Sequence, residues 1–276
     1  MPTPTKPIDA ADKDALRLRV LERVASGPVA PAELLRCVGA GVGRAAVQAI
    51  VREMVAAGEI AYAFEHGRSV LEPSVDRPVR VSERITLAPP GKGGEPPPHG
   101  VLVHIAAGAA FGAGRHPTTR LALRGVDVAL APRGGLAQCG GRVLDVGTGT
   151  GVLAIAAVAL GMSGGLGIDL DPCALAEARH NVRLNRMHDR LRISDQPFEA
   201  VEERFPLVTA NLRTPSLIGL NGALRARLAP FGALVVSGLR VEERAAVVAA
   251  FESVGLRAAW GGEEGGWAAV LLERTG

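Results

Sequence analysis

An apolar run that ends in an acid and three alternating glycines, Val143 to Gly151, constrains the fold of this chain more than any other feature. Its first residues suit a buried strand of a parallel sheet, and Gly147, Gly149 and Gly151 allow a tight turn with bare backbone facing a ligand. The residues from 152 to 160 are almost all apolar and predict a buried helix that starts at this turn. Strand, glycine turn and helix together predict a nucleoside-binding α/β domain.

A second acid follows at a distance that suits a nucleoside site. Gly165 to Asp169 reads as another strand ending in a carboxylate, 18 residues after Gly151. A carboxylate at the carboxyl end of a strand offers two acceptor oxygens to the two hydroxyls of a ribose. A glycine turn alone is a weak indication, because a strand-to-helix turn without any ligand can have the same residues. The acid at this distance favours the ligand.

The spacing of the glycines separates two classes of nucleoside ligand. Dinucleotide sites have the pattern Gly-x-Gly-x-x-Gly with a pyrophosphate at the helix N-terminus, whereas the pattern here is Gly-x-Gly-x-Gly. Asp145, just before the glycines, would repel a pyrophosphate but attract a cationic ligand. S-adenosylmethionine, which carries an ammonium and a sulfonium, therefore fits better than NAD as the cofactor.

The composition narrows the class of protein. With 276 residues the chain is long enough for two modest domains, and 47% hydrophobic against 3% aromatic residues is typical of α/β layers. The net charge of +3 is too small to indicate a nucleic-acid partner, which stays open but is not favoured. Three scattered cysteines suggest neither disulfides nor a metal site. Because the chain shows no signal sequence and no apolar run of about 18 residues, we expect a cytoplasmic protein with no membrane partner.

Residues 1 to 75 predict a small separate domain that resembles a winged helix. Helices are expected at residues 13–26, 31–38 and 43–57, followed by a hairpin that includes Ile60, Tyr62 and Val70. This architecture often binds DNA, but residues 1 to 90 contain 12 Lys and Arg against 11 Asp and Glu. Phosphate binding requires an excess of positive charge, so a protein-docking or dimerising module is favoured over a nucleic-acid reader.

Residues 76 to 100 predict a strand followed by a linker. The run from Val79 to Leu87 alternates as a strand does, and the Pro- and Gly-rich run from Pro89 to Pro98 cannot form a packed element. A catalytic domain is expected from residue 101 to 276, with Trp267 packing in its last strand pair. Its further helices are expected at 120–130, 172–184, 216–228 and 242–254, and its further strands at 101–105, 191–194, 205–210, 233–237, 256–260 and 267–273.

A second glycine-rich stretch, Phe111 to Thr119, precedes the nucleoside strand. Alone, it is explained by a surface turn in which Thr118 or Thr119 caps the next helix. Together with three later stretches, it resembles the methyltransferases that modify large-subunit ribosomal protein eleven. The matching stretches are Phe111 to Thr119, Val143 to Ala157, Gly167 to Pro172 and Val208 to Arg213. They occur in the order and near the spacing of that family, over residues from about Val101 to the C-terminus.

The resemblance implies a fold, a cofactor and a set of site residues. The fold is that of the class I S-adenosylmethionine-dependent methyltransferases, an α/β architecture with a Rossmann-like sheet. Residues that stand where this family contacts S-adenosylmethionine are Thr119, Gly147, Asp169 and Asn211. Gly149 joins them through the glycine turn, and Phe111 lies on the loop that closes over the cofactor. Departures from the family pattern are Ala113, Arg115, Thr148 and Arg213, and residues 1 to 75 do not resemble its ferredoxin-type recognition domain.

These features predict an enzyme that methylates amines, of lysine or of an N-terminus, on a protein substrate, with a ribosomal protein as a candidate. The donor is already activated, so the enzyme mainly aligns the acceptor and excludes water. Asn211 is the predicted catalytic residue, orienting the amine through its amide oxygen. One alternative is a methyltransferase for a small molecule or nucleic acid. Another is a nucleic-acid-binding regulator whose methyltransferase-like domain senses the cofactor.

Overall fold

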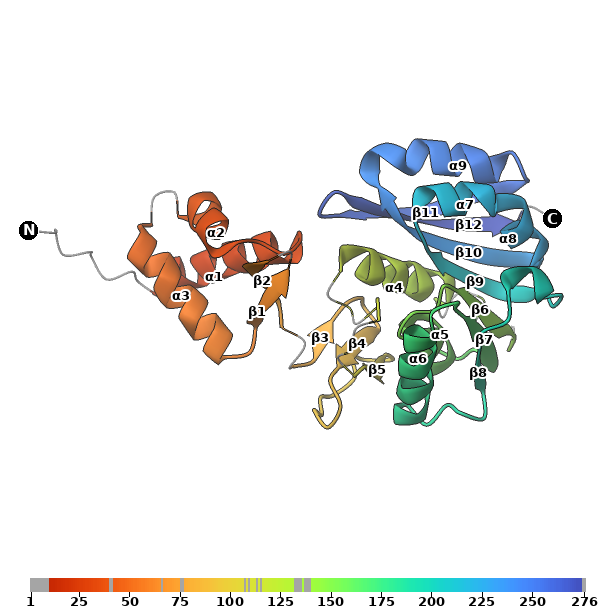
Figure 1. Cartoon of the computed structure of the whole chain (residues 1–276), viewed down its shortest axis with the longest axis horizontal. Coiled ribbons are helices and arrows are strands. Elements are labelled where there is room, and N and C mark those ends of the chain that lie inside the picture. The colour runs from red at the N-terminus through yellow and green to blue at the C-terminus, as the bar shows by residue number, and fades with distance from the viewer. Residues whose placement is uncertain are drawn as a thin grey trace, which may run out of the picture. The chain divides into compact units, whose positions relative to one another are not determined.

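The structure, a computed structural model, divides into two compact units, Met1–Arg77 and Pro78–Gly276. We refer to them as the N-terminal unit and the C-terminal unit; Figure 1 colours the first red to orange and the second yellow to blue. The described residues are 10–39, 42–65, 67–74, 77–106, 108, 110–112, 114, 116–131, 136 and 140–274. The departures from the family pattern at Ala113 and Arg115 lie outside these residues.

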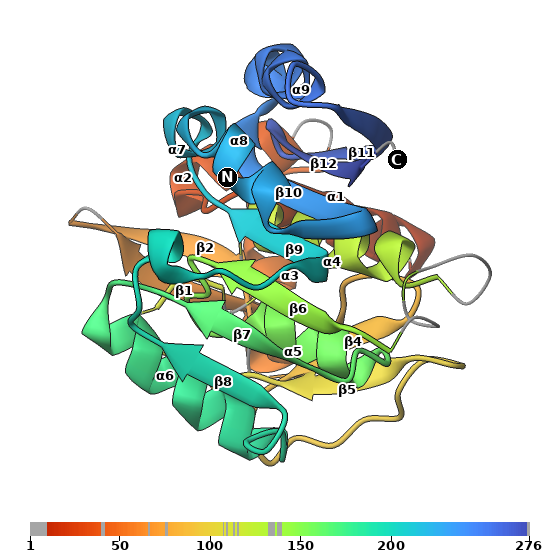
Figure 2. The same ribbon diagram turned by 90° about the vertical axis from the view of Figure 1, so that its right-hand side faces the viewer.

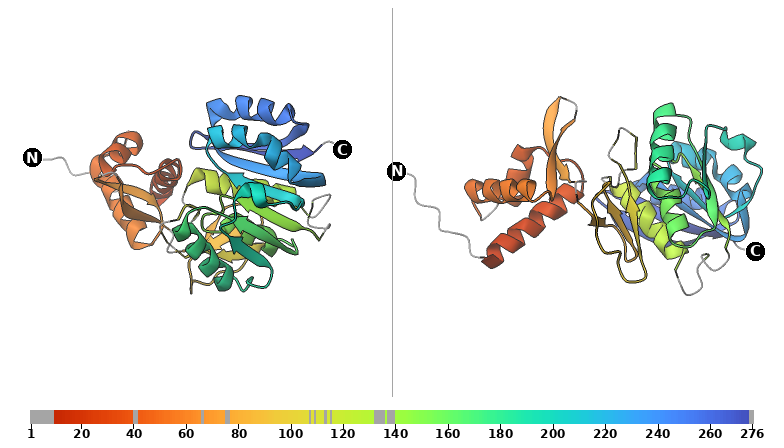
Figure 3. Two further views of the ribbon diagram at one scale, coloured as in Figure 1. Left: turned by 45° about the vertical axis from the view of Figure 1, so that its right-hand side comes forward. Right: turned by 90° about the horizontal axis from the view of Figure 1, so that it is seen from below.

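In its described residues, the N-terminal unit has three helices followed by an antiparallel hairpin (Figure 3). Its elements are α1 (Ala10–Ala25), α2 (Pro31–Val38), α3 (Arg44–Ala56), β1 (Ile60–Glu65) and β2 (Arg68–Pro73). The helices bury one apolar stripe each because apolar residues recur at helical spacing. Buried members of this core include Leu16, Val20, Leu34, Val47, Ile50 and Met54. The order of elements is the expected one, and the winged-helix interpretation remains a prediction.

The C-terminal unit is built on a seven-stranded sheet in the order β11-β12-β10-β9-β6-β7-β8. Five strands are parallel, and β12 runs antiparallel to both β10 and β11. The strands are β6 (Arg142–Val146), β7 (Gly164–Ile168), β8 (Leu191–Ser194), β9 (Phe205–Asn211), β10 (Leu228–Arg240), β11 (Leu256–Glu264) and β12 (Trp267–Arg274). The predicted α/β sheet with a closing antiparallel pair is therefore confirmed.

Helices cover both faces of this sheet, because side chains that alternate along each strand enter two different cores (Figure 2). On β6, Val143 belongs to one core and Leu144 to the other. The first core contains side chains of α4 (Pro117–Ala129), α5 (Val152–Ala159) and α6 (Pro172–Leu184). The second contains side chains of α7 (Thr214–Gly219), α8 (Asn221–Ala226) and α9 (Arg244–Glu252). Short 3-10 turns lie at Phe198–Ala200 and Val241–Glu243.

The single strand predicted from Val79 to Leu87 is wrong. The segment forms two antiparallel strands, β3 (Val79–Arg80) and β4 (Ile85–Ala88), because the Ser82 hydroxyl accepts the Ile85 amide at 3.1 Å and turns the chain. β4 pairs in parallel with β5 (Val101–His104), so this region packs as a three-stranded sheet on the first core.

The outer edge of β5 is closed by a side chain of the turn after α6. The Asn185 amide accepts the His104 N–H at 2.9 Å and donates to the His104 carbonyl at 2.7 Å. Asn181 likewise accepts the Ala106 N–H at 3.0 Å. Two asparagines thus occupy the hydrogen-bonding groups that a neighbouring strand would otherwise take.

The helix predicted at residues 216–228 is also wrong in detail, since it is two short helices, α7 and α8. The chain breaks between them at Leu220, and the Asn221 side chain that follows accepts the Gly222 amide at 2.6 Å. An Asn side chain that competes for backbone amides favours a helix boundary over a helix interior. None of the described helices combines the length and apolar character that a membrane crossing requires.

Candidate functional site

The carboxyl ends of β6, β7 and β9 come together where the chain order in the sheet reverses. β7 lies on one side of β6 and β9 lies on the other, so the boundary between β6 and β9 is the topological switch point. Open α/β sheets bind ligands in the crevice at such points. Gly147 directly follows β6, Asp169 directly follows β7, and Asn211 is the last residue of β9. Three of the predicted site residues therefore lie at this edge of the sheet.

Asp169 joins the end of β7 to the glycine turn after β6. One carboxylate oxygen accepts the Gly149 amide at 2.9 Å, and the other accepts the Asp171 amide at 3.1 Å. The amide of Gly147 bonds the Ile168 carbonyl at 2.9 Å. Each Asp169 oxygen retains acceptor capacity, and the residue is only half-buried. The carboxylate is thus fixed in position while still able to accept hydroxyl groups.

The glycines of the turn allow two other segments to approach closely. Gly149 has φ 54°, and a Cβ there would lie 2.3 Å from the Phe111 carbonyl oxygen. That same oxygen accepts the Thr150 amide at 3.0 Å. At Gly147, with φ 70°, a Cβ would lie 2.6 Å from the Leu212 side chain, just after Asn211. The turn therefore contacts the loop bearing Phe111 and the end of β9.

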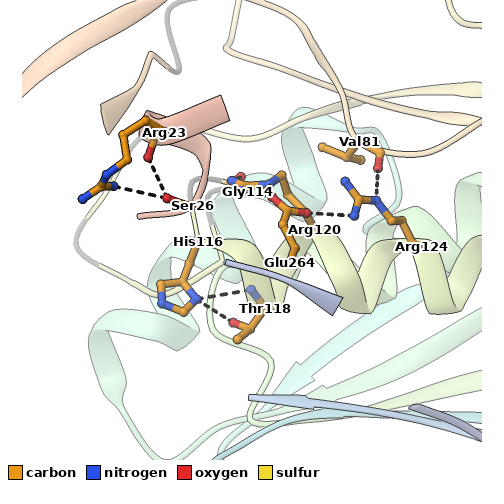
Figure 4. Close-up of polar contacts among 9 residues, drawn as sticks. All are labelled: Arg23, Ser26, Val81, Gly114, His116, Thr118, Arg120, Arg124 and Glu264. Atoms are coloured by element: carbon orange, nitrogen blue, oxygen red, sulfur yellow. Dashed lines mark hydrogen bonds and ion pairs between the residues drawn. The ribbon is translucent and has the colours of Figure 1, made fainter. Parts of the chain in front are cut away.

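The loop before α4 is held to the rest of the unit at further points. The Ala110 amide donates to Glu177 of α6 at 3.1 Å. Arg120 of α4 donates to the Gly114 carbonyl at 3.2 Å and pairs with Glu264 at the end of β11 (Figure 4). The ring of Phe111 remains 52% exposed on this anchored loop. An exposed aromatic beside the glycine turn is available to cover a ligand.

The start of α4, which includes Thr118 and Thr119, is bonded to the sheet next to the end of β9. The Ser237 hydroxyl donates to the Thr118 carbonyl at 2.9 Å, and Ser237 is the sheet partner of Asn211. A Cβ at Gly238 would lie 3.1 Å from the Asn211 amide oxygen. Among the described residues, no hydrogen-bond partner of the Asn211 side chain is found. The start of α4 is therefore bonded to the β10 residue that pairs with Asn211.

Two buried hydroxyls in these segments fit a polar ligand. Thr119 is 1% exposed, and its Oγ1 and the Oγ1 of Thr150 lack a hydrogen-bond partner among the described residues. A buried polar atom without a partner costs about 1 to 3 kcal/mol. Polar groups of a bound nucleoside are partners that would offset this cost, and the site residues therefore fit such a ligand.

Asp145 lies beneath the glycine turn and is fully buried. Thr209 donates its hydroxyl to one carboxylate oxygen at 2.6 Å, and Thr148 donates to the other at 2.7 Å. Burial raises the pKa of Asp145, and these two hydrogen bonds oppose the rise. Asp145 could therefore attract a cationic ligand only at a distance, across the glycine turn, and not by direct contact.

Sequence reasoning missed a stack of side chains beside the loop. The His116 ring lies 5.2 Å from the Phe111 ring and 4.8 Å from the Trp267 ring, and the Arg240 guanidinium lies 3.8 Å from the Trp267 ring centre. Trp267 thus packs across to this loop as well as within its strand pair. His116 stands in a family motif that could have pointed to it, whereas nothing in the sequence links Arg240 to Trp267.

His116 also corrects the predicted cap of the helix after the loop. α4 begins at Pro117, and the capping side chain is His116, whose Nδ1 accepts the Thr118 amide at 3.3 Å (Figure 4). Neither Thr118 nor Thr119 caps the helix, because both lie inside its first turn. Burial, together with the charges of Arg120 and Arg240, lowers the pKa of His116 and so favours its neutral, accepting form.

A mostly parallel seven-stranded sheet, with a glycine turn after β6 and an acid after β7, defines the class I S-adenosylmethionine-dependent methyltransferase fold. The crystal structure of a ribosomal protein L11 methylase from Lactobacillus delbrueckii subsp. bulgaricus is similar, with a TM-score of 0.64 and 25% identity. The match covers 72% of this chain and 100% of that one. Residues 75–275 match the ribosomal protein L11 methyltransferase family, and the chain belongs to that family.

Curated relatives show the same likeness. A ribosomal protein L11 methyltransferase from Geobacter metallireducens is 37% identical over 196 residues, which cover 71% of this chain and 62% of the relative. One from Geobacter sp. strain M21 is 39% identical over 184 residues, 65% of this chain and 58% of the relative. The chain thus spans less than two thirds of the length of these relatives. The N-terminal unit lies almost entirely outside the family match.

Proposed function

We propose that this protein is an S-adenosylmethionine-dependent methyltransferase that methylates amines of a protein, with ribosomal protein L11 as the leading candidate substrate. The observation that carries the proposal is the Asp169 carboxylate, bonded to the Gly149 amide at the switch point of a methyltransferase sheet. The printed names of the relatives supply the candidate substrate. A cytoplasmic location follows from the same proposal.

Six residues would hold the donor. Asp169 has acceptor capacity left for the ribose hydroxyls, while Gly147 and Gly149 present backbone to the donor. Thr119 would bond a polar group of the donor through its unpartnered hydroxyl. Asn211 lies within reach at the end of β9, and Phe111 would cover the bound donor from the loop. When bound, the donor supplies a methyl group already activated by its sulfonium.

The protein must align the acceptor amine and keep it uncharged. Bringing a lysine amine from a pKa of about 10.4 to the neutral form at pH 7 costs about 4 to 5 kcal/mol. Burial of the amine beneath Phe111 would supply part of this by disfavouring the ammonium. The Asn211 amide oxygen would accept an amine hydrogen and so orient the nitrogen lone pair. In this role Asn211 positions the acceptor and does not remove its proton.

The direct test is transfer of a labelled methyl group. Purified protein is incubated with methyl-labelled S-adenosylmethionine and either isolated ribosomal protein L11 or a cell lysate, and the labelled protein is located by mass spectrometry. Label on lysine or N-terminal amines supports the proposal. Label confined to nucleic acid or to small molecules would favour the alternative enzyme, and donor binding without any transfer would favour a cofactor-sensing regulator.

The Asn211→Ala variant tests the positioning role. It should lower turnover and donor affinity without changing the shape of the pH profile, because an amide does not titrate. The matched control is Asn221→Ala, which removes an amide from the start of α8 instead. An Asn211→Ala variant with unchanged turnover would remove this residue from the proposed reaction.

We also propose that the winged-helix-like residues 1–75 select the protein substrate for a catalytic domain at 101–276. A hollow of about 310 Å³ in the N-terminal unit is lined by apolar and polar side chains that include Leu35, Gln48, Val51 and Tyr62. Tyr62 is 57% exposed there. Tyr62→Asp in the full chain should raise KM for the protein substrate and leave donor affinity unchanged, whereas an unchanged KM would argue against this role.

A further inference from the structure

The most basic segment of the chain lies outside the proposed methyl-transfer site. Between Arg179 and Arg192 there are five arginines and two histidines, against the single acid Asp189. The segment carries a formal charge of +4, while the whole chain carries +3, so the rest of the chain is close to neutral. It runs from α6 through a turn to the edge strand β8 (Figures 1 and 2).

The five arginines of this segment are exposed, and no ion pair of theirs is found among the described residues. All of Arg179, Arg183, Arg186, Arg190 and Arg192 are solvent-exposed. In the described part of the chain, none of them pairs with a carboxylate. Other surface arginines do have such partners, as in the pairs Arg142–Glu203 and Arg257–Glu273. Carboxylates of the described residues therefore do not pair with these five guanidiniums.

The charge surrounds a hollow with an apolar floor. The hollow measures about 400 Å³ and is lined by Arg179, Arg183 and His188 together with Val182, Leu191 and Ile193. Arg179 also donates to the Ile193 carbonyl at 3.3 Å, which ties the helix to the edge strand. Arg179 and Arg183 are four residues apart, so they lie one above the other on the same helix face.

Protection of the sheet edge accounts for only part of this pattern. Charged side chains on an edge strand prevent pairing with a foreign strand, and Arg192 on β8 serves that purpose. Arg179 also donates to the Ile193 carbonyl of this strand, whereas Arg183 has no hydrogen-bond partner on β8 among the described residues. Their arrangement around an apolar hollow requires another explanation.

We propose that this hollow binds single-stranded nucleic acid, independently of the methyl-transfer site. The planar guanidiniums of Arg179 and Arg183 match phosphate oxygens with paired hydrogen bonds. An unstacked base would pack on the floor formed by Val182, Leu191 and Ile193. Single strands are bound by this combination of a cationic rim and a surface for bases. A peptide of acidic residues alone, such as polyglutamate, would use the charges but has no ring to pack on the floor.

The test measures binding of a fluorescently labelled single-stranded RNA of mixed sequence to the full-length protein by anisotropy, over a range of salt concentrations. The double variant Arg179→Gln/Arg183→Gln should bind on the order of tenfold more weakly, with a salt dependence reduced by about 1.4 in slope. The matched control is Arg244→Gln/Arg257→Gln, which removes equal charge beside the opposite sheet edge, where both arginines have acidic partners. It should change affinity less than twofold.

Two further measurements separate the proposal from general attraction to polyanions. Arg179→Lys/Arg183→Lys keeps the charge but loses the planar fork, and it should bind several-fold more weakly than the unaltered protein. Single-stranded DNA should compete with the RNA probe, while polyglutamate at equal charge should not. Equal weakening by the control variant, or equal competition by polyglutamate, would overturn the proposal. Unchanged thermal unfolding and donor affinity of each variant would establish that it folds.

Discussion

Asp145 and Asp169 stand at the carboxyl ends of two neighbouring parallel strands, β6 and β7, yet their surroundings are opposite. Asp145 is fully buried between two threonine hydroxyls, and its pKa is raised by burial. Asp169 is half-buried, and its hydrogen bonds to described residues come from backbone amides, with acceptor capacity left over. An acid that follows an apolar run can therefore serve the interior or the crevice. The two carboxylates differ in the neighbouring groups that donate hydrogen bonds to them: threonine hydroxyls for Asp145 and backbone amides for Asp169.

The largest effect should come from Asp169→Ala. Loss of two charge-assisted hydrogen bonds to the ribose should weaken donor binding by about 3 kcal/mol or more, which is at least about 100-fold. Calorimetric titration with S-adenosylmethionine and with its demethylated product measures this. Asp189→Ala, which removes an exposed acid on the same unit, should leave the affinity unchanged. A small effect of Asp169→Ala would mean that Asp169 does not bind the donor.

Thr209→Val tests the interior half of the comparison. The variant keeps the volume but removes a hydroxyl that donates to the buried Asp145 carboxylate. It should lower the free energy of unfolding by about 1.5 to 3 kcal/mol, measured by urea denaturation. The control Thr214→Val removes a hydroxyl that donates to the Glu243 carboxylate nearer solvent, and its cost should be below about 1 kcal/mol. Equal losses of unfolding free energy in the two variants would show that the hydroxyl bonded to the buried Asp145 contributes no more than the one bonded to Glu243.

Asp145→Asn should change how stability depends on pH. Because burial raises the pKa of Asp145, the folded protein holds this proton more tightly than the unfolded chain does. The resulting stability is present below the unfolded-chain pKa of about 3.9 and is lost as the pH rises toward the folded pKa. Relative to the variant, the unaltered protein should therefore lose stability as the pH rises above about 4. Parallel stability curves would show that Asp145 does not titrate in this way.

The smallest effect should come from His116→Asn, at the loop that covers the crevice. The pKa of His116 is lowered by burial, Arg120 and Arg240, so its contribution to stability is present above the unfolded-chain pKa of about 6.5 and is lost as the pH falls below it. Asparagine keeps an acceptor at the start of α4 but does not titrate. Relative to the variant, the unaltered protein should lose a few tenths of a kcal/mol on acidification, because solvent screens the half-exposed ring. Chemical denaturation at pH values on both sides of 6.5 measures the difference.

The features that could be predicted from the sequence are those that local residues determine. The glycine turn and the acid after β7 are short motifs, and helices such as α2 and α6 begin at prolines within clear apolar patterns. The burial of Asp145 could not be predicted, because its partner Thr209 is 64 residues away and only the pairing of β6 with β9 joins them. The contact of Arg240 with Trp267 likewise depends on the register of β10 and β12.

The net charge of the whole chain did not reveal its local cluster of positive charge. The net charge of +3 argued against a nucleic-acid partner, and for residues 1 to 90 the near balance of charges supports that interpretation. The positive charge is instead concentrated in 14 residues that join α6 to β8. A count made over short windows would have found this segment, although not the hollow that α6 and β8 form.

The bonds from Asn185 to both backbone groups of His104 make one side chain imitate a peptide unit. The carboxamide fills the place of a fourth strand beside β5 without adding one. Because the Asn185 side chain occupies both backbone groups of His104, a strand from a second copy of the chain cannot pair with β5 at this residue. Asn185→Leu would leave the backbone N–H and carbonyl of His104 free to pair with another strand, and we expect self-association at high protein concentration.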